Sequence, residues 1–415
     1  MTTFTPDTPE DVVSTLQWAA AEELPLEIVG HGSKRGIGRP INASHTLDLS
    51  RLTGVTLYEP AELVLSARAG TALSEIERLL EANHQELAFE PMDYGQLLGG
   101  TPGQGTIGGV LAANVSGPRR LKAGAARDHV LGVEAVSGRG EAFKSGGRVV
   151  KNVTGYDLSK GMAGSWGTLA VFTSVTFKVL PAAETEQTLL LRGLTDEQAA
   201  AAMAAALGSS AEASGAAHLP APSVARVLGG ALGDRAATAI RIEGVAPSVA
   251  YRLERLRDLL NATAPVQEEL PAEESKRIWR DVRDCIPFAD GSERPVWRVS
   301  MTPSEGWKLT RELRKSAGAE AFYDCQGGLV WLRMQADPDA QEVRRLLRAF
   351  GGGHAMLVRA SLAQRAATAV FEPQPPALAA LSARFKQGFD PNGILNPGRM
   401  GVTATANAAG EAAAK

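Results

Sequence analysis

The chain has 415 residues, of which 44% are hydrophobic, and its formal net charge is −3. This length and composition predict two or three domain units with a sizeable core, and the slightly acidic balance argues against nucleic-acid binding. Two cysteines, Cys285 and Cys325, are too few for a protein-held iron–sulfur cluster or a disulfide framework, and the six histidines form no HxH or HExxH pair, so no metal site is predicted.

The N-terminal region is predicted to form one helix followed by short strands, not the strand–helix alternation of a dinucleotide-binding fold. The predicted elements are a helix over residues 5–23, strands over 26–29, 46–49, 55–58 and 63–67, and a helix over 70–83. The start of the chain carries acidic residues and no basic segment, which argues against a signal peptide. The longest apolar run, residues 199–207, is too short for a spanning helix, which needs about 20 residues. We therefore expect a soluble chain that meets a membrane only through partners.

A glycine-rich stretch at residues 98–131 is the strongest functional signal. Glycine lets the backbone approach a ligand closely and adopt positive φ, and successive N–H groups then form a site for anions. Arg119, Arg120, Lys122 and Arg127 follow the glycines, so the stretch is predicted to hold a diphosphate. The alternative is a flexible loop with a solvated basic face, but the apolar residues between 107 and 113 favour burial.

A second glycine-rich loop, residues 30–38, follows the strand at 26–29. The fingerprint G-x-G-x-x-G would need glycine at position 35, where Arg35 stands. Residues 103–108 do match the fingerprint, but no strand is predicted before them, so the match is weak evidence for a dinucleotide-binding fold. The two glycine-rich segments are distant in sequence and are predicted to close on one diphosphate from two sides.

The rest of the chain continues the first domain and then forms a second. In the first domain we predict a hairpin over 130–136 and 141–144, a helix over 156–162 and a strand over 168–180. In the second we predict a strand over 187–192, a helix over 196–207, a linker over 209–215 and a strand over 237–242. A helix over 248–260 capped by Ser248 and a mobile acidic connection over 268–274 are predicted to follow. From residue 296 the order strand, helix, strand, strand, helix, strand (296–301, 304–316, 319–324, 329–334, 338–350, 354–359) is a split βαβ pattern.

Side-chain alternation on these last strands places Arg298, Arg333 and Arg359 on one sheet face. Guanidinium groups gathered in this way suit a small carboxylate, whereas the alternative is an ordinary solvated sheet face. His354, at the start of the last of these strands, is compatible with a core or turn residue.

Five motifs in order resemble a known family. They are G-x-G-S at 30–33, T-I-G-G-x-x-A-x-N-x-x-G at 106–117, K-N-V-T-G-Y-D-L at 151–158, G-S-W-G-T-L at 164–169 and D-P-N-G-I-L-N-P-G-R-M at 390–400. Together they resemble the PCMH-type FAD-binding family of vanillyl-alcohol-oxidase-like flavoproteins. The sequences G-P-R-R at 117–120 and W-R at 297–298 turn the resemblance toward the FAD-binding subunits of bacterial glycolate dehydrogenase, also called glycolate oxidase.

The resemblance implies an α+β fold and a division of the chain into four parts. These are a PCMH-type FAD-binding domain of two subdomains over 1–182, an α+β cap or substrate domain with a ferredoxin-like split βαβ unit over 183–389, a segment over 390–402 that returns to the flavin, and a disordered tail over 403–415. Residues 396–398, Asn-Pro-Gly, are also compatible with a plain turn.

The resemblance also implies which residues bind the cofactor, with FAD between the two subdomains. They are Gly30, His31, Gly32, Ser33, Lys34, Arg35, Pro91, Thr106, Ile107, Gly108, Gly109, Ala112, Asn114, Gly117, Arg127, Asp128, Gly164, Gly167, Thr168, Ala170, Val171, Asn396 and Arg399. Members that tether flavin covalently place histidine just after a Gly-Gly pair. Here His31 lies between Gly30 and Gly32, which argues for non-covalent FAD.

The implied activity is FAD-dependent oxidation of a small 2-hydroxy acid, glycolate or D-lactate, with Arg298, Arg333 and His354 as candidate catalytic residues. The implied partners are a second FAD subunit and an iron–sulfur subunit that takes the electrons, in a cytoplasmic assembly at the inner membrane. Two classes stay open: an enzyme in its own right, or a flavin-bearing relay or assembly subunit with the chemistry in the sister subunit. A UDP-sugar enolpyruvate reductase of the same superfamily fits worse, because the C-terminal Asn-Pro-Gly return belongs to the oxidase branch.

Overall fold

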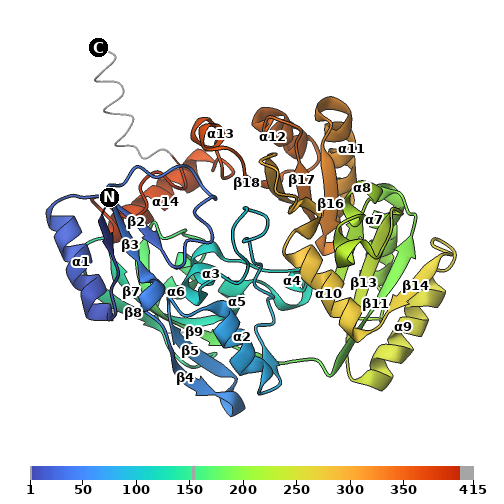
Figure 1. Cartoon of the computed structure of the whole chain (residues 1–415), viewed down its shortest axis with the longest axis horizontal. Helices are drawn as coiled ribbons and strands as arrows, with labels where there is room; N and C mark the ends of the chain where they lie inside the picture. The colour runs from blue at the N-terminus through green and yellow to red at the C-terminus, as the bar shows by residue number, and fades with distance from the viewer. Residues whose placement is uncertain (1, 152–154, 402–415) are drawn as a thin grey trace.

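The computed structural model describes residues 2–151 and 155–401. The centre of the K-N-V-T-G-Y-D-L motif, residues 152–154, and the tail from residue 402 that was predicted to be disordered lie outside the described residues. Figure 1 shows two lobes side by side: an N-terminal lobe in blue to green, and a second lobe in green to orange. The C-terminal helix α14 (Pro376–Phe389) lies back on the N-terminal lobe.

The N-terminal lobe contains two sheets. The first is parallel, in the order β1-β3-β2, and the second is antiparallel, in the order β4-β5-β9-β7-β8. The strands are β1 (Thr2–Phe4), β2 (Leu26–Val29), β3 (His45–Asp48), β4 (Val55–Glu59), β5 (Val64–Arg68), β7 (Val130–Ser137), β8 (Ala142–Gly146) and β9 (Ala170–Lys178), with a short pair β6 (Gln85–Glu86) and β10 (Leu180–Pro181) beside them. The helices are α1 (Pro9–Ala21), α2 (Leu73–Glu81), α3 (Ile107–Ala113), α4 (Arg120–Ala123), α5 (Ala126–His129) and α6 (Leu158–Met162).

The first helix illustrates why these elements form where the sequence places them. The Thr8 side chain caps α1 by accepting the Asp11 N–H, and the Asp11 carboxylate in turn accepts the Thr8 N–H. Pro9 occupies the first turn. Val12 and Leu16 are fully buried on the inner face. The N-terminal secondary structure predicted from residues 5–180 is confirmed, with ends that differ by a few residues.

The second lobe is built on one eight-stranded antiparallel sheet in the order β14-β11-β13-β12-β16-β17-β15-β18. Its strands are β11 (Thr185–Arg192), β12 (Gly215–Leu219), β13 (Ala237–Gly244), β14 (Gln267–Leu270), β15 (Val296–Met301), β16 (Glu320–Asp324), β17 (Leu329–Arg333) and β18 (Gly353–Arg359). Its helices are α7 (Asp196–Leu207), α8 (Ala221–Val224), α9 (Ala246–Leu260), α10 (Ala272–Arg283), α11 (Gly306–Ala317) and α12 (Ala340–Ala349), and α13 (Leu362–Ala367) follows.

This sheet is two split βαβ units joined edge to edge. The second unit, β15-α11-β16-β17-α12-β18, was predicted from the sequence and is confirmed. The first unit, β11-α7-β12-β13-α9-β14, has the same element order, and the two meet where His218 of β12 pairs with Tyr323 of β16. The sequence did not reveal the first unit, because its strands β12 and β14 were not recognised.

Two predictions in this lobe are wrong. The acidic connection at 268–274 is in fact the edge strand β14, which pairs with β11, followed by the start of α10. An edge strand meets solvent on one side, so charged residues there are compatible with pairing. The helix predicted to begin at Ser248 begins at Ala246 instead, and no side chain caps it.

A buried cluster of ionic residues joins the two lobes. Arg241 of β13 donates to both carboxylate oxygens of Glu90, at 2.7 and 3.0 Å. Arg119 donates to Glu86 at 2.6 Å and to Glu243 at 2.7 Å, while its backbone N–H donates to Glu90 at 2.6 Å. Arg241 is 1% exposed. Each carboxylate therefore has a partner, which a buried charge requires.

We predict that Glu90→Gln destabilises the protein by about 3–5 kcal/mol, because it leaves Arg241 buried without its bidentate partner. Burial alone would raise the pKa of Glu90, but Arg241 and Arg119 lower it from 4.5 to about 2. The stability that this group contributes is therefore present above pH 4.5 and is lost as the pH falls toward 2.

Urea unfolding of wild type and variant at several pH values measures both effects. Glu342→Gln, in the exposed ion pair with Arg345, is the control and should change the unfolding free energy little. Equal stability of Glu90→Gln and wild type would contradict the prediction.

Candidate functional site

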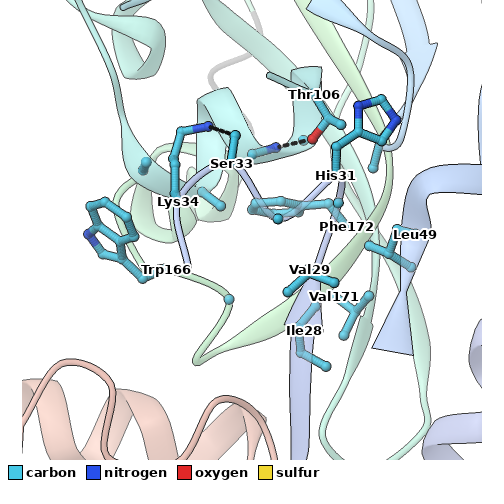
Figure 2. Close-up of a pocket in the computed structure, with 18 of the residues that line it drawn as sticks. Ile28, Val29, His31, Ser33, Lys34, Leu49, Thr106, Trp166, Val171 and Phe172 are labelled. Atoms are coloured by element: carbon cyan, nitrogen blue, oxygen red, sulfur yellow. Dashed lines mark hydrogen bonds between the residues drawn. The ribbon is translucent and has the colours of Figure 1, made fainter. Parts of the chain in front are cut away.

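A pocket opens where the ends of β2, α3 and β9 meet. We call it the glycine pocket. Figure 2 shows Lys34 and Trp166 on one side of it and His31 and Thr106 on the other. The residues predicted to bind the cofactor that line it are Gly30, His31, Gly32, Ser33, Lys34, Arg35, Thr106, Gly108, Gly109, Ala112, Gly167, Ala170, Val171 and Arg399.

The two glycine-rich segments meet at the rim of this pocket. A Cβ at Gly30 would lie 2.6 Å from Thr106 Oγ1, so only glycine allows the loop after β2 to approach α3 this closely. Thr106 caps α3 by accepting the Gly109 N–H at 3.3 Å. The predicted approach of two distant loops is confirmed by this contact.

Two cations in the pocket lack a carboxylate partner among the described residues. The nearest polar contact of Lys34 Nζ is Ser33 Oγ at 3.4 Å. Arg399 donates to the Lys34 carbonyl at 2.7 Å, and its Nε is buried without a partner. Its guanidinium lies over the Trp166 ring, 5.5 Å from the centroid.

The surroundings disfavour both charges. Burial lowers the pKa of Lys34 to about 8, with Asp93 opposing and Arg399 reinforcing the effect. Burial also lowers the pKa of Arg399 to about 10. Because an uncompensated buried charge costs free energy, an anion bound in the glycine pocket would stabilise both groups.

Nine of the predicted cofactor-binding residues do not line the pocket. Several of them support its walls: Asn114 accepts the Arg127 N–H at 2.9 Å, and Asn396 accepts the Ile28 N–H at 2.8 Å and donates to the Trp166 carbonyl at 2.8 Å. The nine are Pro91, Ile107, Asn114, Gly117, Arg127, Asp128, Gly164, Thr168 and Asn396. Residues 396–398 are therefore more than a plain turn, because they join β2 to the loop that carries Trp166.

The prediction that the cations of the 98–131 stretch hold a diphosphate is wrong. Arg119 is committed to Glu86 and Glu243 in the interlobe cluster. Arg120, Lys122 and Arg127 are exposed and do not line the glycine pocket. The cations at the pocket are Lys34, Arg35 and Arg399 instead, because the fold brings the 30–38 loop and the C-terminal segment to the glycines of α3.

The sequence analysis missed seven apolar residues of the lining. These residues are Ile28, Val29, Leu49, Ala69, Ala113, Trp166 and Phe172. Trp166 carries a signal in the sequence that could have found it, because it stands between Gly164 and Gly167, and in the structure it adopts a positive φ of 55°. A bulky residue in that conformation is uncommon and often marks a functional segment.

The second lobe presents a sheet face with three rows of paired residues. The first row is Asp324, Leu329, Ser300 and His354; the second is Phe322, Trp331, Arg298 and Met356; the third is Glu320, Arg333, Val296 and Arg359. The register confirms the prediction that Arg298 and Arg333 share one face. Arg359 follows a β-bulge beside Val296, and its place near Arg333 is shown by Asp290, which both arginines contact.

The three arginines differ in their bonding. Arg333 donates to both Asp290 and Glu320, so its charge is already neutralised. Arg359 donates to the carbonyls of Leu97 and Phe288, at 3.1 and 2.8 Å. Arg298 is half-buried and makes no ion pair among the described residues.

Arg298 affects several buried groups near the first row. Burial raises the pKa of Asp324 to about 7, with Arg298 among the charges that oppose the rise. Although the Arg120 residue as a whole is exposed, its guanidinium is partly buried and donates to Ser116 at 2.8 Å; this partial burial and then the charge of Arg298 lower the pKa of Arg120. His354 is exposed at the start of β18. The charge of Arg298 therefore disfavours the charge of Arg120.

Within residues 2–151 and 155–401, no group of three or more His, Cys, Asp or Glu side chains is arranged to hold a metal ion. No helix in the same part of the chain has the length and apolar composition required to cross a bilayer.

Comparisons with known proteins agree with this geometry. A family described as "FAD binding domain" matches residues 2–146. The glycolate oxidase subunit GlcE of Escherichia coli (strain K12) is 32% identical over 395 residues, covering 95% of this chain and 97% of that protein. The glycolate oxidase subunit GlcD of Bacillus subtilis (strain 168) is 45% identical over 85 residues, 20% of this chain and 18% of that one.

A solved structure of p-cresol methylhydroxylase with substrate bound superposes with a TM-score of 0.68 at 14% identity, covering 97% of this chain and 89% of that one. At this identity the likeness shows the fold alone, and it confirms the predicted PCMH-type α+β fold.

We predict that Gly109→Val gives a folded protein whose FAD affinity is at least about tenfold lower. A Cβ at Gly109 would lie 3.1 Å from Thr106 Oγ1 and 3.5 Å from Lys34 Nζ, inside the pocket. Gly108→Val is the comparison, because its Cβ would lie 2.7 Å from Ala69 Cβ and should lower thermal stability instead. Calorimetric titration with FAD measures the first effect and thermal unfolding the second. Normal FAD affinity in Gly109→Val would contradict this placement of the ligand.

We also predict that FAD affinity weakens as the pH rises through about 8, because Lys34 loses its proton there. Below pH 8 the ammonium group is present and pairs with an anion; above it, the dissociation constant should rise by up to about tenfold per pH unit. Titration of apoprotein with FAD across this range tests the idea. Lys34→Arg should abolish the pH dependence, and a variant that keeps it would show that another group is responsible.

Proposed function

The chain belongs to the family of the glycolate oxidase subunit GlcE, and on that premise we propose that it is the FAD-binding subunit of a glycolate-oxidising complex. Its role is to take part in the oxidation of glycolate, or of D-lactate, to the 2-oxo acid. The observation that carries this proposal is the glycine pocket, where two loops of small residues surround Lys34 and Arg399, which have no carboxylate partner among the described residues.

The residues of the pocket suit a flavin dinucleotide. Lys34 and Arg399 would neutralise the diphosphate, while Gly30 and Gly109 give its oxygens access to backbone N–H groups. Trp166 and Phe172 supply aromatic surface for the rings. Bound there, FAD would supply the two-electron redox chemistry that no side chain provides. His31 does not follow a Gly-Gly pair, so the flavin is proposed to be non-covalent and released by acid.

The substrate is proposed to bind between the lobes, at Arg298 and at Arg120, whose pKa the charge of Arg298 lowers. Two guanidinium groups without a carboxylate partner suit the carboxylate of a 2-hydroxy acid. Arg333 is left out of this site, because Asp290 and Glu320 already engage it.

Two groups in the first row of the sheet face can accept the substrate hydroxyl proton. His354 is exposed, whereas Asp324 is 2% exposed and accepts the Cys325 N–H at 2.6 Å. With a pKa near 7, Asp324 is partly ionised at neutral pH.

The relay function is the second candidate, and the burial of Asp324 favours it. A carboxyl group that is 2% exposed must be reached by substrate before it can act as a base. In the relay, the sister FAD subunit oxidises the substrate, and this chain holds a flavin that passes electrons toward an iron–sulfur subunit. Both candidates place the chain in a complex on the cytoplasmic side of the membrane, held there by its partners.

We predict that anaerobic glycolate bleaches the flavin of the purified chain, and that Arg298→Ala slows this reduction about 10- to 100-fold through loss of a charge-assisted contact. Stopped-flow absorbance measures the rate. Arg348→Ala, an exposed arginine on α12, is the matched control and should reduce at the wild-type rate. Wild-type flavin that stays oxidised with glycolate, yet is reduced when the sister subunit is added, would favour the relay.

A further inference from the structure

A second pocket lies beside the glycine pocket, at the outer side of β2 and of the loop that follows it. We call it the arginine pocket, and its charged residues are Arg35, Arg39, Arg365, Arg399 and Glu27. Successive side chains of a strand point to opposite faces, so Glu27 lines this pocket while its neighbour Ile28 lines the glycine pocket. Of the described residues, only Arg35 and Arg399 line both. The two pockets are therefore separate sites with a shared wall.

Three segments that are distant in sequence form the arginine pocket. The loop after β2 contributes Arg35 and Arg39, the short helix α13 contributes Arg365, and the C-terminal segment contributes Arg399. The Arg39 N–H donates to the Arg399 carbonyl at 2.9 Å, and the Arg365 side chain donates to the Gly38 carbonyl at 2.9 Å. Because α13 follows the last strand of the second lobe, this pocket lies where the chain returns from that lobe to the first.

The charges of this pocket do not balance. Arg35 is paired with Glu27, whose two carboxylate oxygens it binds at 3.0 and 2.9 Å. Arg39, Arg365 and Arg399 form no ion pair among the described residues, and their guanidinium groups donate to backbone carbonyls instead. In this part of the chain the arginine pocket thus holds four cations and one carboxylate. A single carboxylate ligand would leave two of these cations uncompensated.

Two guanidinium nitrogens of the pocket are buried and have no hydrogen-bond acceptor among the described residues. They are Nε of Arg365 and Nε of Arg399. Arg399 is 5% exposed, and burial lowers its pKa to about 10, with Glu27 opposing this effect and Arg365 and Arg35 adding to it. Burial also lowers the pKa of Arg365. Since a buried donor without an acceptor costs free energy, these nitrogens indicate that a bound acceptor completes the pocket.

The composition of the pocket suits the phosphate group of a small organic molecule. Guanidinium groups bind phosphate oxygens through pairs of parallel N–H groups, and a dianion matches several uncompensated cations better than one carboxylate does. The remaining lining is apolar, with Ile37, Pro40 and Ile41 in the loop after β2 and Leu362 at the start of α13. Leu362 is 65% exposed, so an apolar part of the ligand has surface to cover. A flavin in the glycine pocket would reach neither α13 nor these apolar residues.

We propose that the arginine pocket binds a small organic phosphate, at a site separate from that of FAD. Arg39, Arg365 and Arg399 hold the phosphate, and the apolar part of the ligand lies on Ile41 and Leu362. This binding function goes beyond the oxidation proposed above and does not depend on it. A ligand in this position contacts both α13 and the loop after β2, so it stabilises the contact between them and the folded state with it.

Calorimetric titration of the full chain, saturated with FAD, tests the proposal with phenyl phosphate as the probe. We expect saturable binding whose affinity falls at least about tenfold in Arg365→Gln and in Arg39→Gln, since each variant loses a charge-assisted contact. Arg348→Gln, on the exposed side of α12, is the matched control and should bind as wild type does. FAD content should be equal in all of these proteins, because none of the three side chains lines the glycine pocket. Phenyl phosphate should also raise the unfolding temperature of wild type, and Arg365→Gln should lose that rise.

Two further probes define the class of ligand. Inorganic phosphate should bind more weakly than phenyl phosphate, and Leu362→Ser should bring the two affinities together, because it removes apolar surface at the edge of the pocket. Malonate, a dianion with two carboxylates and no phosphate, should bind more weakly than phenyl phosphate.

Four results would each overturn the proposal. They are the absence of saturable binding to wild type, unchanged affinity in both Arg365→Gln and Arg39→Gln, release of FAD by phenyl phosphate, and tighter binding of malonate. A chain that takes up no FAD, yet binds phenyl phosphate with the expected losses in the two arginine variants, would contradict the proposed function and support this inference.

Discussion

The geometry of the glycine pocket depends on hydrogen bonds made by the side chain of Asn396. Its carbonyl oxygen accepts the Ile28 N–H at the end of β2, and its amide donates to the Trp166 carbonyl. Its backbone N–H donates to Leu26. Three segments far apart in sequence thus meet at one buried residue, which adopts the left-handed conformation that asparagine tolerates. Without this junction, the loop after β2 and the loop that carries Trp166 would have no fixed separation.

The pocket built on this junction contains positive charges that no carboxylate of the described residues neutralises. Lys34 and Arg399 occupy surroundings that lower the pKa of both, and neither has a carboxylate partner among the described residues. A bound anion would compensate the free-energy cost of burying these two charges. The buried charges of Glu90, Arg119 and Arg241, in the cluster that joins the lobes, are paired instead. The charges of the interlobe cluster thus stabilise the fold, whereas those of the glycine pocket would be stabilised by a bound anion.

The sheet of the second lobe, built from two split βαβ units, also carries both paired and unpaired arginines among the described residues. On one face, Arg333 and Arg359 are held by hydrogen bonds to other residues, whereas Arg298 makes no ion pair among the described residues and its charge lowers the pKa of Arg120. The interlobe cluster fixes this sheet relative to the first lobe. Because that cluster includes Arg119, the residue before Arg120, it also positions the cation that is proposed to meet the substrate.

The sequence by itself determined the local features of this protein. Glycine spacing, alternating strands and capping residues are properties of short segments, so the two glycine-rich loops, the second split βαβ unit and the shared face of three arginines were all predicted correctly. The acidic edge strand β14 and the Ala-rich strand β12 were missed, because their residues are typical of strands only once a neighbour pairs with them.

Only the tertiary structure decided which cations serve the pocket and which serve the scaffold. The sequence analysis offered the cations of the 98–131 stretch as well as Lys34, Arg35 and Arg399, yet Arg119 is engaged by glutamates from β6 and β13. Lys34 and Arg399, more distant in sequence, are the ones that the fold brings to the glycine pocket. Ion pairing depends on separation in space and on the free-energy cost of burial, and neither can be read from the order of residues.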